Sequence, residues 1–103
     1  MNNKMIEGNY VAEADEIFCG VVKGNLTVKS GVTFNNLGTI CGVIIIEQDA
    51  VLEHRGTARD SVIGPGCIKV WGVVKGEIMT AKYHIYKNAV VNGVPCEQDE
   101  IRE

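Results

Sequence analysis

The side chains of this chain that could do chemistry are four cysteines and two histidines: Cys19, Cys41, Cys67, Cys96, His54 and His84. Thiolate and imidazole groups are the ligands that zinc prefers, and cysteines can also pair as disulfides. No two of these cysteines have the C-x-x-C spacing of a zinc or redox motif, which makes a zinc site or a disulfide framework the less favoured alternative. We therefore expect free, buried or half-buried thiols and two surface histidines, with no metal and no cofactor.

One short segment invites an enzymatic interpretation. Residues 62–67 (VIGPGC) resemble a single unit of the left-handed hexapeptide repeat of acyltransferases. Those enzymes need many consecutive units and a catalytic histidine at a subunit cleft, and only one good unit occurs here. The chain also has no G-x-S-x-G or H-E-x-x-H motif. The sequence therefore predicts no catalytic residues and a protein that is not an enzyme.

Length and charge narrow the class of protein. The chain has 103 residues, enough for one domain, and 46% of them are hydrophobic, enough for a packed core. A net charge of −3 disfavours nucleic acid and anionic membranes as partners. Because there is no apolar run of about 18 residues and no signal-peptide pattern at the N-terminus, we expect a cytoplasmic protein.

An internal repeat organises the whole sequence. Residues 20–24 (GVVKG) recur unchanged at residues 72–76, and related segments begin at positions 4, 38, 56 and 89. The steps between successive segments are 16 to 18 residues. A near-constant period of this length is typical of a solenoid, in which each repeat forms one coil and packs only on its neighbours.

Every second residue of each repeat forms a column through the expected stack. Three apolar columns can be written, and we predict that each faces the axis. The first contains Ile6, Val22, Ile40, Ala58, Val74 and Val91. The second contains Tyr10, Leu26, Ile44, Val62 and Ile78. The third contains Phe18, Phe34, Leu52, Val70 and Ile85. A further column of glycines contains Gly8, Gly24, Gly42, Gly76 and Gly93, with Asp60 interrupting it.

These columns predict an all-β, single-domain right-handed β-helix of five to six coils, over residues 1–94. Residues 95–103 contain four carboxylates and read as a short, solvated acidic tail. Neither end of the stack has a recognisable capping helix. We therefore expect both terminal coils to expose unpaired backbone and to stack against other subunits.

The coil pattern resembles that of the bactofilins, the polymer-forming bacterial cytoskeletal family. The stretches that carry the resemblance are residues 22–28 (VKGNLTV), 40–46 (ICGVIII) and 74–80 (VKGEIMT), with residues 87–93 matching the junction between coils. The resemblance implies a right-handed β-helix that polymerises end to end without nucleotide. The implied partner is the chain itself, as a homo-oligomer or a filament.

A second surface is expected on one side of the stack. If the axial columns point inward, an apolar patch points outward, consisting of Cys41, Val43, Ile45, Ile63 and Met79. Exposed apolar patches normally mark interaction sites. This patch, together with the small size and acidity of the chain, supports an alternative function as a protein-binding module, such as a toxin-neutralising immunity protein.

Overall fold

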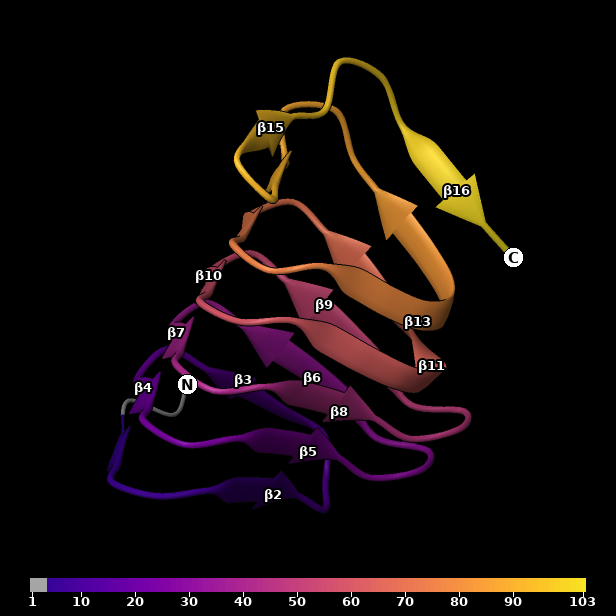
Figure 1. Cartoon of the computed structure of the whole chain (residues 1–103). Helices are drawn as coiled ribbons and strands as arrows, with labels where there is room; N and C mark the ends of the chain where they lie inside the picture. The colour runs from indigo at the N-terminus through magenta and orange to yellow at the C-terminus, as the bar shows by residue number, and fades with distance from the viewer. Residues whose placement is uncertain (1–3) are drawn as a thin grey trace.

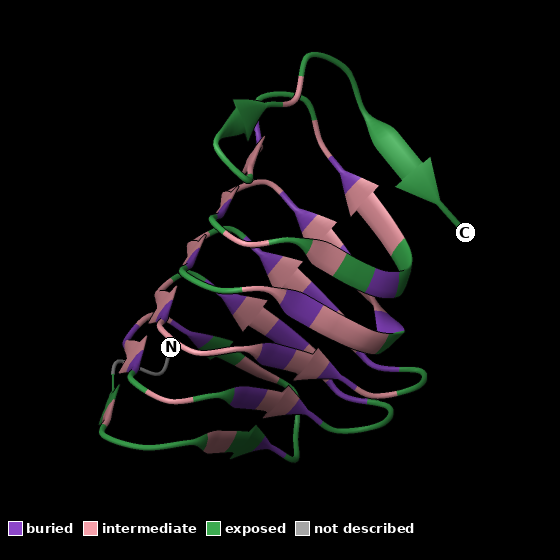
Figure 2. Ribbon diagram, in the orientation of Figure 1, coloured by how far each residue is buried: buried purple, intermediate pink, exposed green. Residues whose placement is uncertain are grey.

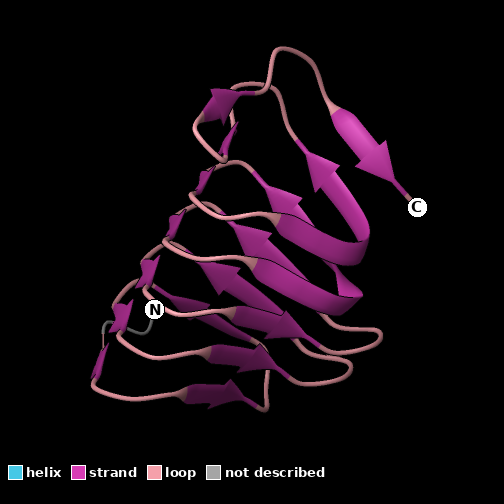
Figure 3. Cartoon of the chain, viewed as in Figure 1, coloured by secondary structure: helices cyan, strands magenta, loops and turns pink. Residues whose placement is uncertain are grey.

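The computed structural model describes residues 4–103, and within them the chain forms strands and no helix (Figure 3). The chain winds upward through about five turns, with the strand of residues 10–12 (β2) at the bottom of the view and the C-terminal strand leaning away at the top (Figure 1). No helix that could cross a membrane occurs among these described residues. The predicted all-β solenoid is confirmed.

The strands line three sides of the stack, here named sheets I, II and III, of which II and III are joined into one sheet by the two longest strands. Sheet I consists of β1 (Met5–Ile6), β4 (Val21–Val22), β7 (Thr39–Ile40), β10 (Thr57–Ala58), β12 (Val73–Val74), β14 (Val90–Val91) and β15 (Val94–Pro95). Sheet II consists of β2 (Tyr10–Ala12), β5 (Leu26–Val28), β8 (Ile44–Ile46) and the first halves of β11 (Val62–Val70) and β13 (Ile78–Ile85). Sheet III consists of β3 (Glu16–Phe18), β6 (Thr33–Asn36), β9 (Val51–His54), the second halves of β11 and β13, and β16 (Glu100–Arg102).

The first two predicted columns match the observed register. In sheet I the parallel pairs join Ile6, Val22, Ile40, Ala58, Val74 and Val91 in that order. In sheet II they join Tyr10, Leu26, Ile44, Val62 and Ile78. The central members of both columns are fully buried, which places the hydrophobic core along the axis (Figure 2).

The third predicted column was wrong, because it merged two neighbouring inward columns of sheet III. Phe34 stacks on Leu52, which is followed by Ile68 and Tyr83. Phe18 instead stacks on Asn36, and this second column continues through His54, Val70 and Ile85. Residues two apart in a strand both face inward, so period alone does not distinguish them. Polar residues in the second column concealed it from a search for apolar repeats.

Glycine occupies the corner where the chain turns from sheet III into sheet I at positions 20, 38, 56 and 72, whereas Ala89 holds this position at the last corner. A Cβ atom on Gly38 would overlap the backbone carbonyl of Gly20 in the coil below, and Gly56 and Gly72 have the same relation to their lower neighbours. Only a residue without a side chain allows the coils to approach this closely. The repeated glycines of the sequence are therefore a condition of the stacking.

The chain reverses direction after its last coil. Asn92 and Gly93 both have positive φ values, 52° and 78°, and join β14 to β15 as a tight antiparallel hairpin. An Asn-Gly pair with two positive φ angles is typical of a type I′ turn. Gly93 was predicted in the glycine column, but it lies in this turn instead.

The residues after the turn fold back over the end of the stack. Strand β16 pairs antiparallel with the end of β13, whereas the coils pair with one another in parallel. Residues 94–103, here named the strap, therefore cover part of the C-terminal end. The predicted solvated tail is exposed along β16 but paired. The expectation of an open C-terminal end is wrong along sheets I and III, where the strap pairs with β14 and with the end of β13.

Candidate functional site

Among residues 4–103 no strand covers the N-terminal end of the solenoid, which is an open sheet edge on all three sides. Strands β1, β2 and β3 are terminal in the order of their sheets. Tyr10 donates its amide to the second coil and Ala12 accepts there. Because hydrogen bonds alternate along a parallel strand, the N–H and C=O of Val11 point to the open side. Such an edge is a template for another strand.

Exposed apolar side chains surround this open edge. Met5, Val11 and Ile17, one on each sheet, are 59%, 48% and 46% exposed. The ladder partners of Val11 and Ile17 in the second coil are the polar residues Thr27 and Asn35. The sequence analysis did not single out these three residues. For Val11 and Ile17 the signal was an apolar residue at an outward position that is polar one repeat later.

The interior of the N-terminal end is aromatic. The rings of Phe18 and Phe34 have centroids 5.7 Å apart, and Tyr10 lies 6.0 Å from Phe18. The Tyr10 hydroxyl donates a hydrogen bond to Glu16. Burial and the Glu16 carboxylate raise the pKa of Tyr10 to about 12, so this hydroxyl stays protonated at neutral pH. The open end is thus rigidly packed inside and unpaired along its rim.

The predicted lateral patch is only partly assembled by the fold. Ladder pairing brings Ile45, Ile63 and Met79 side by side on the outer face of sheet II, and Met79 is 55% exposed. Cys41 and Val43 lie apart from this row, between β7 and β8, and are half-buried. The row continues downward through Thr27 to the exposed Val11. The outer face of sheet II is therefore apolar in its upper coils and again at Val11 on the open N-terminal edge, with polar Thr27 between them.

The strap is attached at two points of the C-terminal end. At the first, Cys96 donates its amide to Ala89 (2.7 Å) and accepts from Asn88 (2.8 Å). At the second, the Asp99 carboxylate accepts from the Lys87 amide (2.8 Å) and pairs with His84 Nε2 (2.9 Å). The hydrogen bond from His84 and that from Lys87 lower the pKa of Asp99. As predicted, His84 lies on the outer face.

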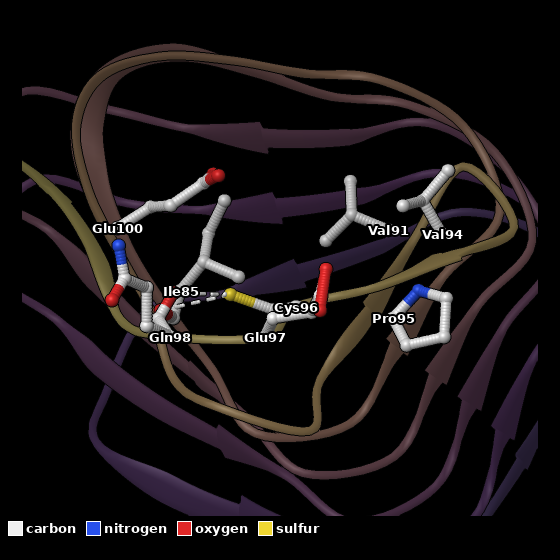
Figure 4. Close-up of a pocket in the computed structure, with 8 residues that line it drawn as sticks. All are labelled: Ile85, Val91, Val94, Pro95, Cys96, Glu97, Gln98 and Glu100. Atoms are coloured by element: carbon white, nitrogen blue, oxygen red, sulfur yellow. Dashed lines mark hydrogen bonds between the residues drawn. The ribbon is translucent and has the colours of Figure 1, made fainter.

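A cavity of about 690 Å³ remains between the strap and the last coil. Ile85 and Val91 line it from the coil, and Val94 and Gln98 line it from the strap. The Cys96 thiol donates to the carbonyl oxygens of Ile85 and Gln98, as the dashed lines in Figure 4 show. The strap therefore covers the end of the core without filling it.

A ladder of stacked planar groups runs up one corner to the strap. The Arg55 guanidinium lies 4.0 Å from the Trp71 ring centroid, and Trp71 stacks on Tyr86 at 4.3 Å. Tyr86 stacks on His84 at 3.8 Å, and His84 binds Asp99. Such stacks stiffen a surface corner by burying ring faces against one another.

His54 does not lie on the surface, where the sequence analysis had placed it. Its side chain is fully buried in sheet III between Asn36 and Val70 of the same column. Burial lowers the pKa of His54, while the hydrogen bond to the Val73 carbonyl has a smaller opposite effect. A neutral imidazole with both nitrogens engaged serves the core and has no access to a substrate.

The four cysteines are half-buried and free, with no disulfide among residues 4–103. Burial raises the pKa of the Cys67 thiol, against the weaker effect of Lys69 and Lys82. The same residues contain no group of three side chains placed to hold a metal ion. The two ends of the solenoid are therefore the most distinctive candidate sites.

Comparison with known proteins gave no relative: no family model, no curated protein and no solved structure matches this chain.

Proposed function

We propose that this protein is a non-enzymatic, bactofilin-like structural scaffold of the cytoplasm that self-assembles through the ends of its β-solenoid. The observation that carries the proposal is the open N-terminal edge. Three terminal strands end there together, and Met5, Val11 and Ile17 surround them with exposed apolar surface. The bactofilin resemblance of the coil motifs supports the same function.

The physical basis is strand addition. An unpaired edge offers hydrogen-bonding groups in the spacing that another strand requires, and apolar side chains beside it add burial. Soluble proteins usually protect such edges with prolines, charges or covering segments. The C-terminal end has this protection in Pro95 and the strap, whereas β1, β2 and β3 have no covering strand among the described residues.

The alternative function is a compact binding module, such as a toxin-neutralising immunity protein. The covered C-terminal end favours it, because a solenoid with one open end forms a discrete complex more readily than a filament. In that case the open edge, or the apolar row of Ile45, Ile63 and Met79, would bind one protein partner.

Sedimentation velocity over a concentration series, with negative-stain images of the same samples, tests the proposal. For the parent chain, the mass of the sedimenting species should increase with protein concentration. Val11→Pro should abolish this gain, because proline removes the N–H that points to the open edge. Val11→Ala is the matched control, since it shortens the side chain but keeps the N–H.

Two outcomes would count against the scaffold. One is a monomer at every concentration, both for the parent and for a chain without the strap. The other is a fixed small oligomer that Val11→Pro leaves unchanged, which would favour the binding module and direct the search to a separate partner.

A further inference from the structure

Beneath the strap lies an edge that continues the solenoid. Strands β13 and β14 pair in parallel with the coil below, and on their other side the strap pairs with β14 and with the second half of β13. Extending the observed columns by one repeat places Tyr10 of a second copy on Ile78, Phe18 on Ile85 and Val22 on Val91. Strand β1 of that copy must then yield its place in sheet I, because β14 already fills it. Each contact adds one member to a column that already exists.

The outer surfaces also match in this arrangement. Met79 and Val11 occupy the two ends of the same outward column of sheet II, and they are 55% and 48% exposed. A head-to-tail contact would place Val11 of one copy beside Met79 of the next. The apolar row of sheet II would then cross the junction between subunits, interrupted in each copy by Thr27, and the exposed ends of both rows would be covered.

The charges of the two ends are complementary. The first coil, residues 4–19, contains four carboxylates and one lysine. The last coil, residues 75–92, contains three lysines and one carboxylate. Opposite charges on two docking surfaces attract the correct partner and disfavour others. Contact between two first coils would bring like charges together, so this distribution favours head-to-tail contact.

The strap has the charge pattern of the first coil. Its ten residues contain four carboxylates and one arginine, and it lies on the basic last coil. It therefore occupies the same edge, with the same sign of charge, as the first coil of a second copy would.

The strap is also lightly held. Every residue of β16 is exposed, and Val94 and Ile101 are 66% and 55% exposed. Besides its short ladders with β13 and β14, its fixed points are Cys96 and the Asp99 carboxylate, and a cavity of about 690 Å³ lies between it and the last coil. Segments with few buried contacts open locally at low cost in free energy.

We propose that the strap is an internal competitor for the assembly site: it occupies the edge of β13 and β14 that otherwise accepts the first coil of a second copy, head to tail. This inference rests on the proposed scaffold function and adds its regulation. When the strap is closed, head-to-tail addition is blocked. When it opens, both ends of the solenoid are available and a polar filament can grow.

The test compares two full-length variants that lose one strap carboxylate each. Asp99→Ala removes the bonds to His84 and Lys87. The matched control is Glu97→Ala, because the Glu97 side chain makes no hydrogen bond or ion pair among those described. Sedimentation velocity should show about a tenfold larger association constant for Asp99→Ala than for the parent or Glu97→Ala, because loss of a charged hydrogen bond favours the open strap. Adding Val11→Pro to Asp99→Ala should reverse the gain.

A second variant removes the whole strap, in case the single substitution Asp99→Ala has only a weak effect. A chain ending at Gly93 lacks the strap, and circular dichroism reports whether it keeps its β-structure. If neither this chain nor Asp99→Ala associates more than the parent, while the parent itself assembles, the competitor role is wrong and the scaffold function stands. If no form assembles, the scaffold function fails as well. If either variant associates more strongly than the parent, and this increase persists when Val11→Pro is added, the proposed head-to-tail contact is wrong.

Discussion

His54 and Asn36 hydrogen-bond to one another inside the core, with 3.2 Å between Nδ1 and Nδ2, from stacked positions of adjacent coils. The geometry of these contacts determines which ring nitrogen of His54 carries the proton. The Val73 carbonyl can only accept, so His54 Nε2 donates to it, and Nδ1 must then accept from Asn36. The Gly38 amide donates to Asn36 Oδ1 and holds the carboxamide in this orientation.

This pair predicts that acid destabilises the fold. Burial lowers the pKa of His54, so below about pH 6.5 the unfolded chain binds a proton that the folded chain refuses. The contribution to stability is therefore complete above about pH 6.5. It is lost as pH falls below that value, by up to about 1.4 kcal/mol per pH unit. Urea denaturation at several pH values measures it.

The controls for this prediction separate the two histidines. His54→Gln should remove most of the slope between about pH 6.5 and 5, although it lowers stability overall by about 1–3 kcal/mol through lost hydrogen bonds. His84→Gln should keep the slope. A parent whose stability is flat in this range would contradict the assignment of His54 as the neutral, buried base.

The corner glycines give a prediction with an internal control. Gly38→Ala places a methyl group into the Gly20 carbonyl and should destabilise the fold by about 2–3 kcal/mol, as overpacking of a rigid site does. Gly8→Ala should change stability by less than about 1 kcal/mol, since nothing lies within 4 Å of its added Cβ. Equal effects in thermal unfolding would show that the corner relaxes freely.

The repeat could be predicted from the sequence because each coil repeats the same local requirements. Val22, Ile40 and Val74 occupy one buried column, and the register follows once these residues are aligned. A shift by one residue would turn the whole inward set to solvent. Strong patterning of this kind fixes a solenoid from the sequence alone.

Two features were missed because they break the repeat. Asn36 and His54 are polar residues in an otherwise apolar column, and they are satisfied by each other and by the backbone of Gly38 and Val73. The strap was concealed by Gly93, which fits the glycine column by spacing. The preceding Asn92 makes the pair a hairpin signal that the periodicity overrode.

The hairpin itself can be tested at Gly93. Its φ of 78° is a conformation that β-branched residues avoid, so Gly93→Val should weaken the turn by about 1–2 kcal/mol. Because the strap is fixed just beyond it, the amides of β16 should exchange with solvent about tenfold faster. Hydrogen exchange read by mass spectrometry measures this. Asn92→Gly, which keeps positive φ accessible, should leave the exchange nearly unchanged, and core strands should be unaffected in both variants.

The stacked corner provides a last prediction about what stiffens the upper coils. Trp71, the one tryptophan of the chain, lies between Arg55 and Tyr86, so Trp71→Ala removes a cation–π contact and a ring stack together. The expected loss is about 1–2 kcal/mol beyond the burial of the ring. Trp71→Phe keeps a flat ring in the same place and should recover more than half of it. Circular dichroism during urea unfolding is the suitable measurement, because both variants lose the fluorophore. If alanine and phenylalanine were equally destabilising, the indole would matter for its size or its N–H, and the stack would contribute little.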